Sequence, residues 1–243
     1  VKPGYSATSR CTTGAMGDAA ISFHLIGDAT CTFTNTLEAP AAITLTAVPT
    51  TAVVGSNVLL TATVTISNGT PVADGTVVSF TASLGNLAPV TATTAGGVAT
   101  ATLSSTIAGV ATVTATTGSL NATVLVTFTP GAPFTLTLTA VPDTLSVDAS
   151  STLTATATDQ YGNPAADSTT ISFTTSLGTL SSGTASTSGG NAAVTLGSTT
   201  PGVATVTATI GSLSATTLVT FTPGAPFTVT LTAVPDTVLV GNA

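Results

Sequence analysis

The chain has 243 residues, of which 43% are apolar and only 5% are charged, and its net charge is −7. Lys2 and Arg10 are the only basic residues. Because contacts to a phosphate backbone or to anionic lipid depend on Lys and Arg, this composition excludes nucleic-acid binding and argues against docking on a membrane. No apolar run approaches the ~18 residues that a spanning helix needs, so no membrane insertion is expected of this segment.

The first segment, residues 1–38, contains both cysteines. Cys11 and Cys31 flank an alternating stretch in which antiparallel neighbours would face each other, and we predict a disulfide between them in an oxidising extracellular setting. With His24 they supply too few ligands for zinc, and they lack the C-x-x-C spacing of a redox pair. His24, the sole histidine, would lie ~13 Å along a strand from Asp28, too far for a catalytic hydrogen bond. We therefore predict no catalytic residue and no cofactor.

Beyond residue 38 the chain repeats itself with an offset of 93 residues. The phrase FTPGAPFTLTLTAVPD, which begins at Phe128, returns as FTPGAPFTVTLTAVPD from Phe221. This repeat predicts complete units at 39–131 and 132–224, and the first strand or strands of a third unit at 225–243. We expect the chain to be an excerpt of a longer protein, with partial domains at both ends.

Within each unit apolar residues alternate with threonine, which accounts for about a quarter of the chain. In TLTATATD, from Thr152 to Asp159, this period of two puts Leu and Ala on one face and Thr on the other, as in a half-buried antiparallel strand. Turn residues return often enough to predict about seven strands per unit, an all-β immunoglobulin-like sandwich. The few large apolar residues are expected in the cores: Phe80, Leu84, Leu103, Phe128, Phe173, Leu177, Leu196 and Phe221.

The linker between units is only TPGAP. Proline fixes its own φ and restricts the residue before it, so this joint should bend less than a Gly/Ser tether of equal length. Units joined in this way predict a rod. Asp143 and Asp236 directly follow the Pro of each repeated phrase, and they are weak candidates for a junctional Ca²⁺ site, because hard cations bind several oxygens. Turn-forming and solubilising roles are the preferred interpretation of these carboxylates.

Two sequences fit the acceptor pattern for N-glycosylation, at Asn68 in NGT and at Asn121 in NAT. In a chain so rich in threonine the pattern also arises by chance. O-linked sugar on outward threonine rows is a comparable hypothesis. No Lys occurs in either unit, and Lys on edge strands is a common block to pairing with another chain, so association of copies into fibres is also predicted.

The second unit resembles a known family. LTATATDQYGNPAADSTTISFTTSLGTLS, followed by GGNAAVTLGSTTPGVATVTATIGSLSAT, is similar to the bacterial Ig-like domain of the invasin and intimin type. Asp159, Gly162, Asn163 and Pro164 carry its D-x-x-G-N-P turn, whereas the first unit has Ile66 in place of the Asp. GDATCTFTNT from Gly27 resembles the closing strand of a prealbumin-like surface domain, so residues 1–38 are expected to be its C-terminal fragment.

The resemblance implies a non-catalytic structural spacer in the stalk of a large secreted or surface-anchored, adhesin-like protein. The expected location is extracellular, at the cell surface or in a secreted fibre, and the expected partners are neighbouring repeats and other copies of the chain. One alternative is a self-assembling filament subunit, completed by strand addition from a neighbour. Another is an adhesin module whose loops bind a surface glycan or a receptor.

Overall fold

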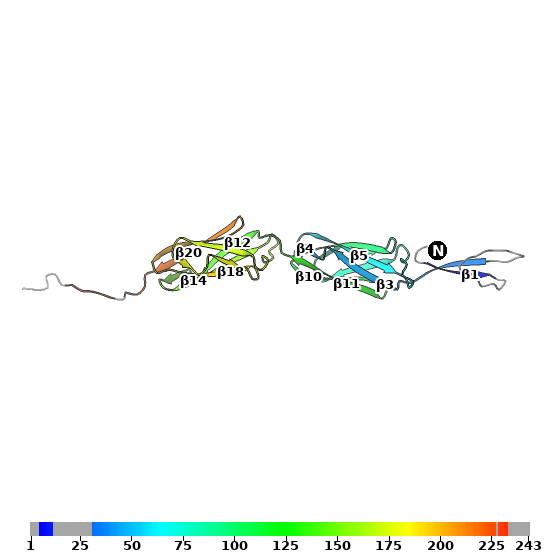
Figure 1. Ribbon diagram of the computed structural model, residues 1–243, viewed down its shortest axis with the longest axis horizontal. Coiled ribbons are helices and arrows are strands. Elements are labelled where there is room, and N and C mark those ends of the chain that lie inside the picture. Colours follow the sequence, from blue (N-terminus) through cyan, green and yellow to red (C-terminus); the bar gives the residue numbers. More distant parts are fainter. Residues whose placement is uncertain (1–4, 12–30, 227, 233–243) are drawn as a thin grey trace, which may run out of the picture. The chain divides into compact units, whose positions relative to one another are not determined.

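The computed structural model describes residues 5–11, 31–226 and 228–232, and at 5–11 and 31–36 it describes the backbone alone. The chain divides into two compact units, Val1–Gly131 and Ala132–Ala243. All elements of the described residues are β-strands (Figure 1), which confirms the predicted all-β class. In the same residues no helix is long and apolar enough to span a membrane.

The chain begins with a hairpin of β1 (Tyr5–Cys11) and β2 (Cys31–Leu37). The two strands are antiparallel, and Cys11 is the register partner of Cys31. Directly opposed residues of an antiparallel pair have Cα atoms about 4.5–5.5 Å apart, within the range that a disulfide spans. The disulfide itself stays a prediction, because the structure does not describe the side chains of the two cysteines. His24 and Asp28 lie outside the described residues.

The first unit continues as a sandwich of two sheets. One sheet has the order β3-β5-β9-β7 and the other β4-β11-β10-β6-β8. The strands are β3 (Ala42–Val48), β4 (Thr51–Val53), β5 (Asn57–Thr65), β6 (Val77–Ala82), β7 (Asn86–Ala88), β8 (Thr91–Thr93), β9 (Val98–Ser104), β10 (Gly109–Thr117) and β11 (Leu120–Thr129).

The second unit repeats this topology strand for strand. Its sheets have the orders β12-β14-β18-β16 and β13-β20-β19-β15-β17. The strands are β12 (Thr135–Val141), β13 (Thr144–Ser146), β14 (Ser150–Thr158), β15 (Thr170–Thr175), β16 (Thr179–Leu180), β17 (Thr184–Ser186), β18 (Asn191–Gly197), β19 (Gly202–Ile210) and β20 (Leu213–Thr222).

Each sandwich thus has nine strands where about seven were expected. The additional strands are short and arise where one expected strand is divided into two. Pro49 separates β3 from β4, and Pro89 separates β7 from β8. Proline has no N–H to donate to a ladder, so a strand is interrupted where one occurs. The chain then continues in the opposite sheet, which places β3 and β4 at edges of different sheets.

The alternation of threonine with apolar residues sorts the side chains as predicted. On β14, Leu153, Ala155 and Ala157 are fully buried, while Thr152 on the other face is exposed. Each unit has its own cluster of buried apolar residues between its sheets. The expected core residues Phe80, Leu103, Phe128, Phe173, Leu196 and Phe221 are all buried.

Leu84 and Leu177 are only partly buried, at the margins of the two cores. Each approaches a glycine: a Cβ built on Gly109 would lie 3.2 Å from Leu84 Cδ2, and one built on Gly202 would lie 3.0 Å from Leu177 Cδ2. The glycine at the start of β10 and of β19 therefore leaves the space that the leucine at the core margin occupies.

Candidate functional site

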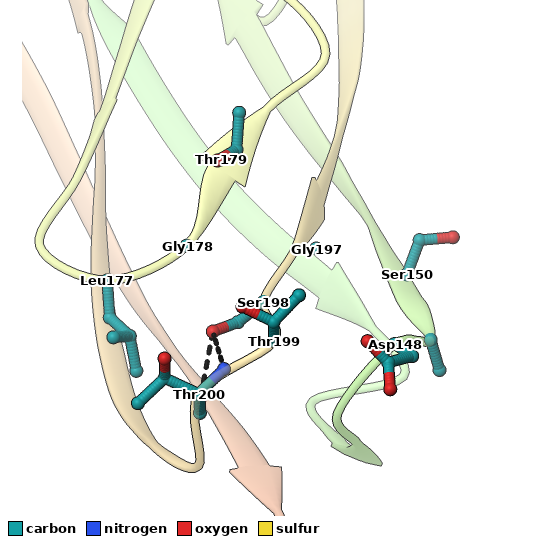
Figure 2. A pocket seen from close by; sticks show the side chains of 10 residues that line it. Asp148, Ser150, Leu177, Gly178, Thr179, Gly197, Ser198, Thr199 and Thr200 are labelled. Carbon is teal, nitrogen blue, oxygen red and sulfur yellow. Dashed lines mark hydrogen bonds between the residues drawn. The ribbon is translucent and has the colours of Figure 1, made fainter.

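A shallow hollow of about 590 Å³ lies at one end of the second unit. Three turns line it, those between β13 and β14, between β15 and β16, and between β18 and β19 (Figure 2). Its polar groups include the carboxylate of Asp148 and the hydroxyls of Ser198 and Thr200. Apart from Leu177, which was expected in the core, no sequence pattern groups these residues.

The hydroxyl of Ser198 is engaged within its own turn. Ser198 Oγ donates to the carbonyl oxygen of Thr200 (2.8 Å) and accepts from the Thr200 N–H (3.1 Å), as Figure 2 shows. The N–H of Asp148 donates to the Ser198 carbonyl (3.0 Å). One carboxylate remains, with no second titratable side chain among the lining residues, so the hollow holds neither an acid–base pair nor a nucleophile with its base.

Asp148 has a left-handed backbone conformation, with φ of 70°. The equivalent residue of the first unit is Gly55, with φ of 83°, and its N–H makes the same contact with a carbonyl oxygen, that of Ser105, at 2.7 Å. A side chain is disfavoured at such φ values, whereas glycine adopts them without steric cost.

We therefore expect Asp148→Gly to raise the free energy of unfolding of the second unit by about 0.5–1 kcal/mol. Urea unfolding followed by hydrogen exchange of peptides from each unit measures this change. The matched control is Gly55→Asp, which should destabilise the first unit by a similar amount. A loss of stability in Asp148→Gly would mean that the Asp side chain contributes more than its backbone conformation costs.

The turn after β14 is organised by a buried carboxylate. Asp159 is 2% exposed, and its Oδ1 accepts from the backbone N–H of Tyr161 (2.9 Å) and of Asn163 (2.9 Å). The Asn163 side chain donates from Nδ2 to Oδ1 (3.1 Å) and to Oδ2 (2.9 Å). These bonds give Asp159 a structural role in holding the turn.

Two of the described aromatic side chains of the second unit are exposed. Tyr161 is 44% exposed at the tip of the turn that Asp159 holds. Phe134, just before β12, is 63% exposed and was missed as a surface residue. In FTLTLTA, Phe134 has the same parity as Leu136 and Leu138, so the alternation predicts its burial and carries no signal of its exposure.

The predicted calcium site is not supported by a set of ligands. Asp143 is exposed and its carbonyl oxygen accepts from the N–H of Thr220 (2.8 Å). Asp236 lies outside the described residues. Among the residues that are described, no three His, Cys, Asp or Glu side chains group closely enough to hold a metal ion. A role for Asp143 and Asp236 in Ca²⁺ binding therefore stays a weak prediction.

The faces of both sandwiches are uncharged. None of the strands from β3 to β20 contains an acidic or basic residue. On the sheet that β19 and β20 share with β13, β15 and β17, the outward residues are Thr or Ser, except Val203 and Leu218. Hydroxyl groups therefore solvate surfaces on which other proteins place charges.

In each sandwich the short second strand pairs in parallel with the last strand. β4 lies parallel to β11, with Thr51 opposite Thr127, and β13 lies parallel to β20, with Thr144 opposite Thr220. Bonds at both ends of each pair extend the ladder. In the second unit the Thr220 N–H donates to the Asp143 carbonyl (2.8 Å), and the Val147 N–H donates to that of Thr222 (3.0 Å). A short strand near the start of each sandwich is thus bonded to the strand that ends it.

Comparison with known proteins identifies related folds. A family model described as bacterial Ig-like domain (group 1) matches residues 135–222. Invasin, described as a bacterial integrin-binding protein, is 25% identical over 81% of this chain and 44% of that chain, with a TM-score of 0.65. InvD of Yersinia pseudotuberculosis is 29% identical over 79% of this chain and 60% of that chain, with a TM-score of 0.55.

The D0-D1 domains of intimin are 30% identical to the chain, with coverage of 75% of this chain and 98% of that chain and a TM-score of 0.33. A search of curated proteins found no match. The chain spans less than half of the invasin chain and 60% of the InvD chain.

Proposed function

Because this chain belongs to the bacterial Ig-like domains of the invasin and intimin type, we propose that its two units are non-catalytic spacers in the stalk of an adhesin-like protein at the bacterial surface. A spacer between an anchor and a binding region transmits the tension between them. Its fold must therefore resist a pull applied at its two ends. The observation that supports this function best is the parallel pairing of β4 with β11 and of β13 with β20, which joins a strand near the start of each sandwich to its last strand.

Tension along the chain acts on these pairs in shear. Because β13 and β20 are parallel, a pull on the N-terminal end of β13 and on the C-terminal end of β20 slides the two strands past each other along their length. All hydrogen bonds of the pair then resist together, whereas an antiparallel hairpin pulled from its open end separates one bond at a time. β4 and β11 have the same arrangement in the first unit. This geometry supports a mechanical function in both units.

The proposal can be tested by stretching single molecules of the whole chain from their two ends. Val147→Pro removes the N–H that donates to Thr222 and so should lower the unfolding force of the second unit. Val147→Ala is the matched control, because it shortens the side chain and keeps the N–H. The first unit, which is unaltered, is an internal reference in each recording.

Circular dichroism must first establish that Val147→Pro folds without tension. A folded Val147→Pro variant whose two units both unfold at the original force would contradict the proposal, since the parallel pair would then carry no tension. If Val147→Ala and Val147→Pro lower the force equally, side-chain packing rather than the hydrogen bond resists the pull.

Association with other copies of the chain remains part of the proposal for its partners. The uncharged strands support it, because they lack the charges that keep sheet edges and faces apart. Filament assembly by strand addition and binding of a glycan or receptor stay predictions. Phe134 and Tyr161 are the exposed aromatic side chains on which a receptor contact in the described residues would most depend.

A further inference from the structure

The two N-glycosylation patterns lie in different structural settings. Asn68 is in an exposed turn after β5, and Asn121 is the second residue of β11. A transferase must enclose the acceptor Asn and the Thr two residues later, so the segment has to leave the protein surface. From this difference we propose that Asn68 is the N-glycosylation acceptor of the folded chain and that Asn121 is not. This modification is independent of the mechanical function proposed above.

The turn at Asn68 projects from the sandwich. Residues 67–70 are all exposed, while Ile66 before them is buried and anchors the turn. The Ile66 N–H donates to the Thr70 carbonyl (2.9 Å), and the Gly69 N–H donates to the Ile66 carbonyl (2.9 Å). A Cβ built on Gly69 would have nothing within 4 Å. An enzyme can therefore approach the turn without displacing neighbouring elements.

The side chains of this turn already make the contact that the acceptor pattern brings together. The Thr70 hydroxyl donates to Asn68 Oδ1 (2.8 Å), and the Thr70 N–H donates to the same oxygen (2.9 Å). Both bonds are accepted by the carboxamide oxygen, so Nδ2 takes no part in them. No described residue makes a hydrogen bond to Asn68 Nδ2, so the nitrogen that would receive the sugar is open to solvent.

Asn121 is held by the sheet. Its register partner is Thr116 on β10, and the pairing continues along the hairpin through Thr114 opposite Thr123. Asn121 and Thr123 point to the same face, but neighbours on one face of a strand are about 6.6 Å apart along the chain, and no hydrogen bond joins them in the described structure. Enclosing this pattern in an active site would require the first residues of β11 to separate from β10.

The transfer has a balanced chemistry. The donor class is an oligosaccharide linked through a diphosphate to a polyprenyl lipid. The bond between the sugar C1 and the diphosphate oxygen breaks, and the lipid diphosphate leaves with the electron pair. A bond forms between C1 and Asn68 Nδ2, which loses one proton to the medium. No oxidant or reductant is involved.

The second unit offers no equivalent acceptor. Tyr161 occupies the place of Asn68, and Asn163 occupies that of Thr70, where its side chain bonds Asp159. The turn of the first unit thus combines exposure with an acceptor sequence, and the corresponding turn of the second unit is held by its own buried carboxylate. A glycan at Asn68 would also add a hydrophilic group to a sandwich whose strands carry no charged residue.

The test uses an oligosaccharyltransferase that recognises Asn-x-Thr and a lipid-linked oligosaccharide of known mass. As a positive control, the whole chain is unfolded in urea, the urea is diluted, and the enzyme is added at once. In this unfolded sample the enzyme must glycosylate both Asn68 and Asn121. It is then given the folded chain, and glycopeptides are quantified by mass spectrometry. We expect modification at Asn68 to continue in the folded chain, and that at Asn121 to fall by at least about tenfold, since paired strands open far less often than exposed turns.

Three variants make the test specific. Asn68→Gln and Thr70→Val should each abolish modification of the folded chain, whereas Asn121→Gln should leave it unchanged. Equal modification of both asparagines in the folded chain, or modification of Asn121 alone, would overturn the proposal. It would also be overturned if the folded chain accepted no sugar although the unfolded chain accepted it at Asn68.

Discussion

Replacement of Phe221 by alanine is expected to unfold the second unit and to leave the first one folded. Phe221 is 2% exposed, in β20, within the apolar cluster between the two sheets of its unit. Removing a buried Phe side chain costs about 3–5 kcal/mol through lost burial and the cavity that remains. This is a large part of the ~5–15 kcal/mol that stabilises a typical domain.

Hydrogen exchange measured on peptides of each unit distinguishes this result from a general loss of stability. Peptides of 132–224 should lose protection in Phe221→Ala, while those of 39–131 keep it, because each unit has its own buried cluster. Phe128→Ala is the matched control, since Phe128 is 1% exposed at the equivalent position of the first unit. In Phe128→Ala, peptides of 39–131 should lose protection and those of 132–224 should keep it. Loss of protection in both units in either variant would contradict independent cores.

Replacement of Asp159 by alanine is expected to destabilise the second unit by about 2–4 kcal/mol. The substitution removes the acceptor of two backbone N–H groups and of the Asn163 side chain. Asn163 is itself buried, so its polar groups would lose these partners away from water, which is more costly than losing an exposed hydrogen bond. Urea unfolding of the whole chain, with exchange of peptides from the second unit, measures the effect.

The first unit supplies a control for this prediction. Its turn makes the same backbone bonds with Ile66 in place of Asp159 and Thr70 in place of Asn163. We therefore expect transfer of the sequence ISNGT, residues 66–70, to positions 159–163 to restore most of the stability that Asp159→Ala loses. If Asp159→Ala has no effect, the turn is held by its backbone bonds alone. If the transferred sequence is as unstable as Asp159→Ala, the two turns are not interchangeable.

Much of the architecture follows from local pattern, because the signals in this chain are short-range. The burial of Leu153 and the exposure of Thr152 depend on a period of two that any strand imposes. The constant offset of the repeat places Phe80 and Phe173, like Phe128 and Phe221, in equivalent cores. Asp159 could be assigned to its turn, but its four hydrogen bonds could not, because they depend on the path of the backbone around the carboxylate.

The amino-acid sequence by itself determined the class of the fold, the repeat and the faces of the strands, since alternation and turn residues act within a few positions. Only the tertiary structure decided that β13 pairs in parallel with β20, because Thr144 and Thr220 meet only after the whole sandwich has closed between them. The left-handed conformation of Asp148 and the open setting of Asn68 were decided in the same way. Each depends on where the ends of separate strands come to lie, and no local pattern encodes that.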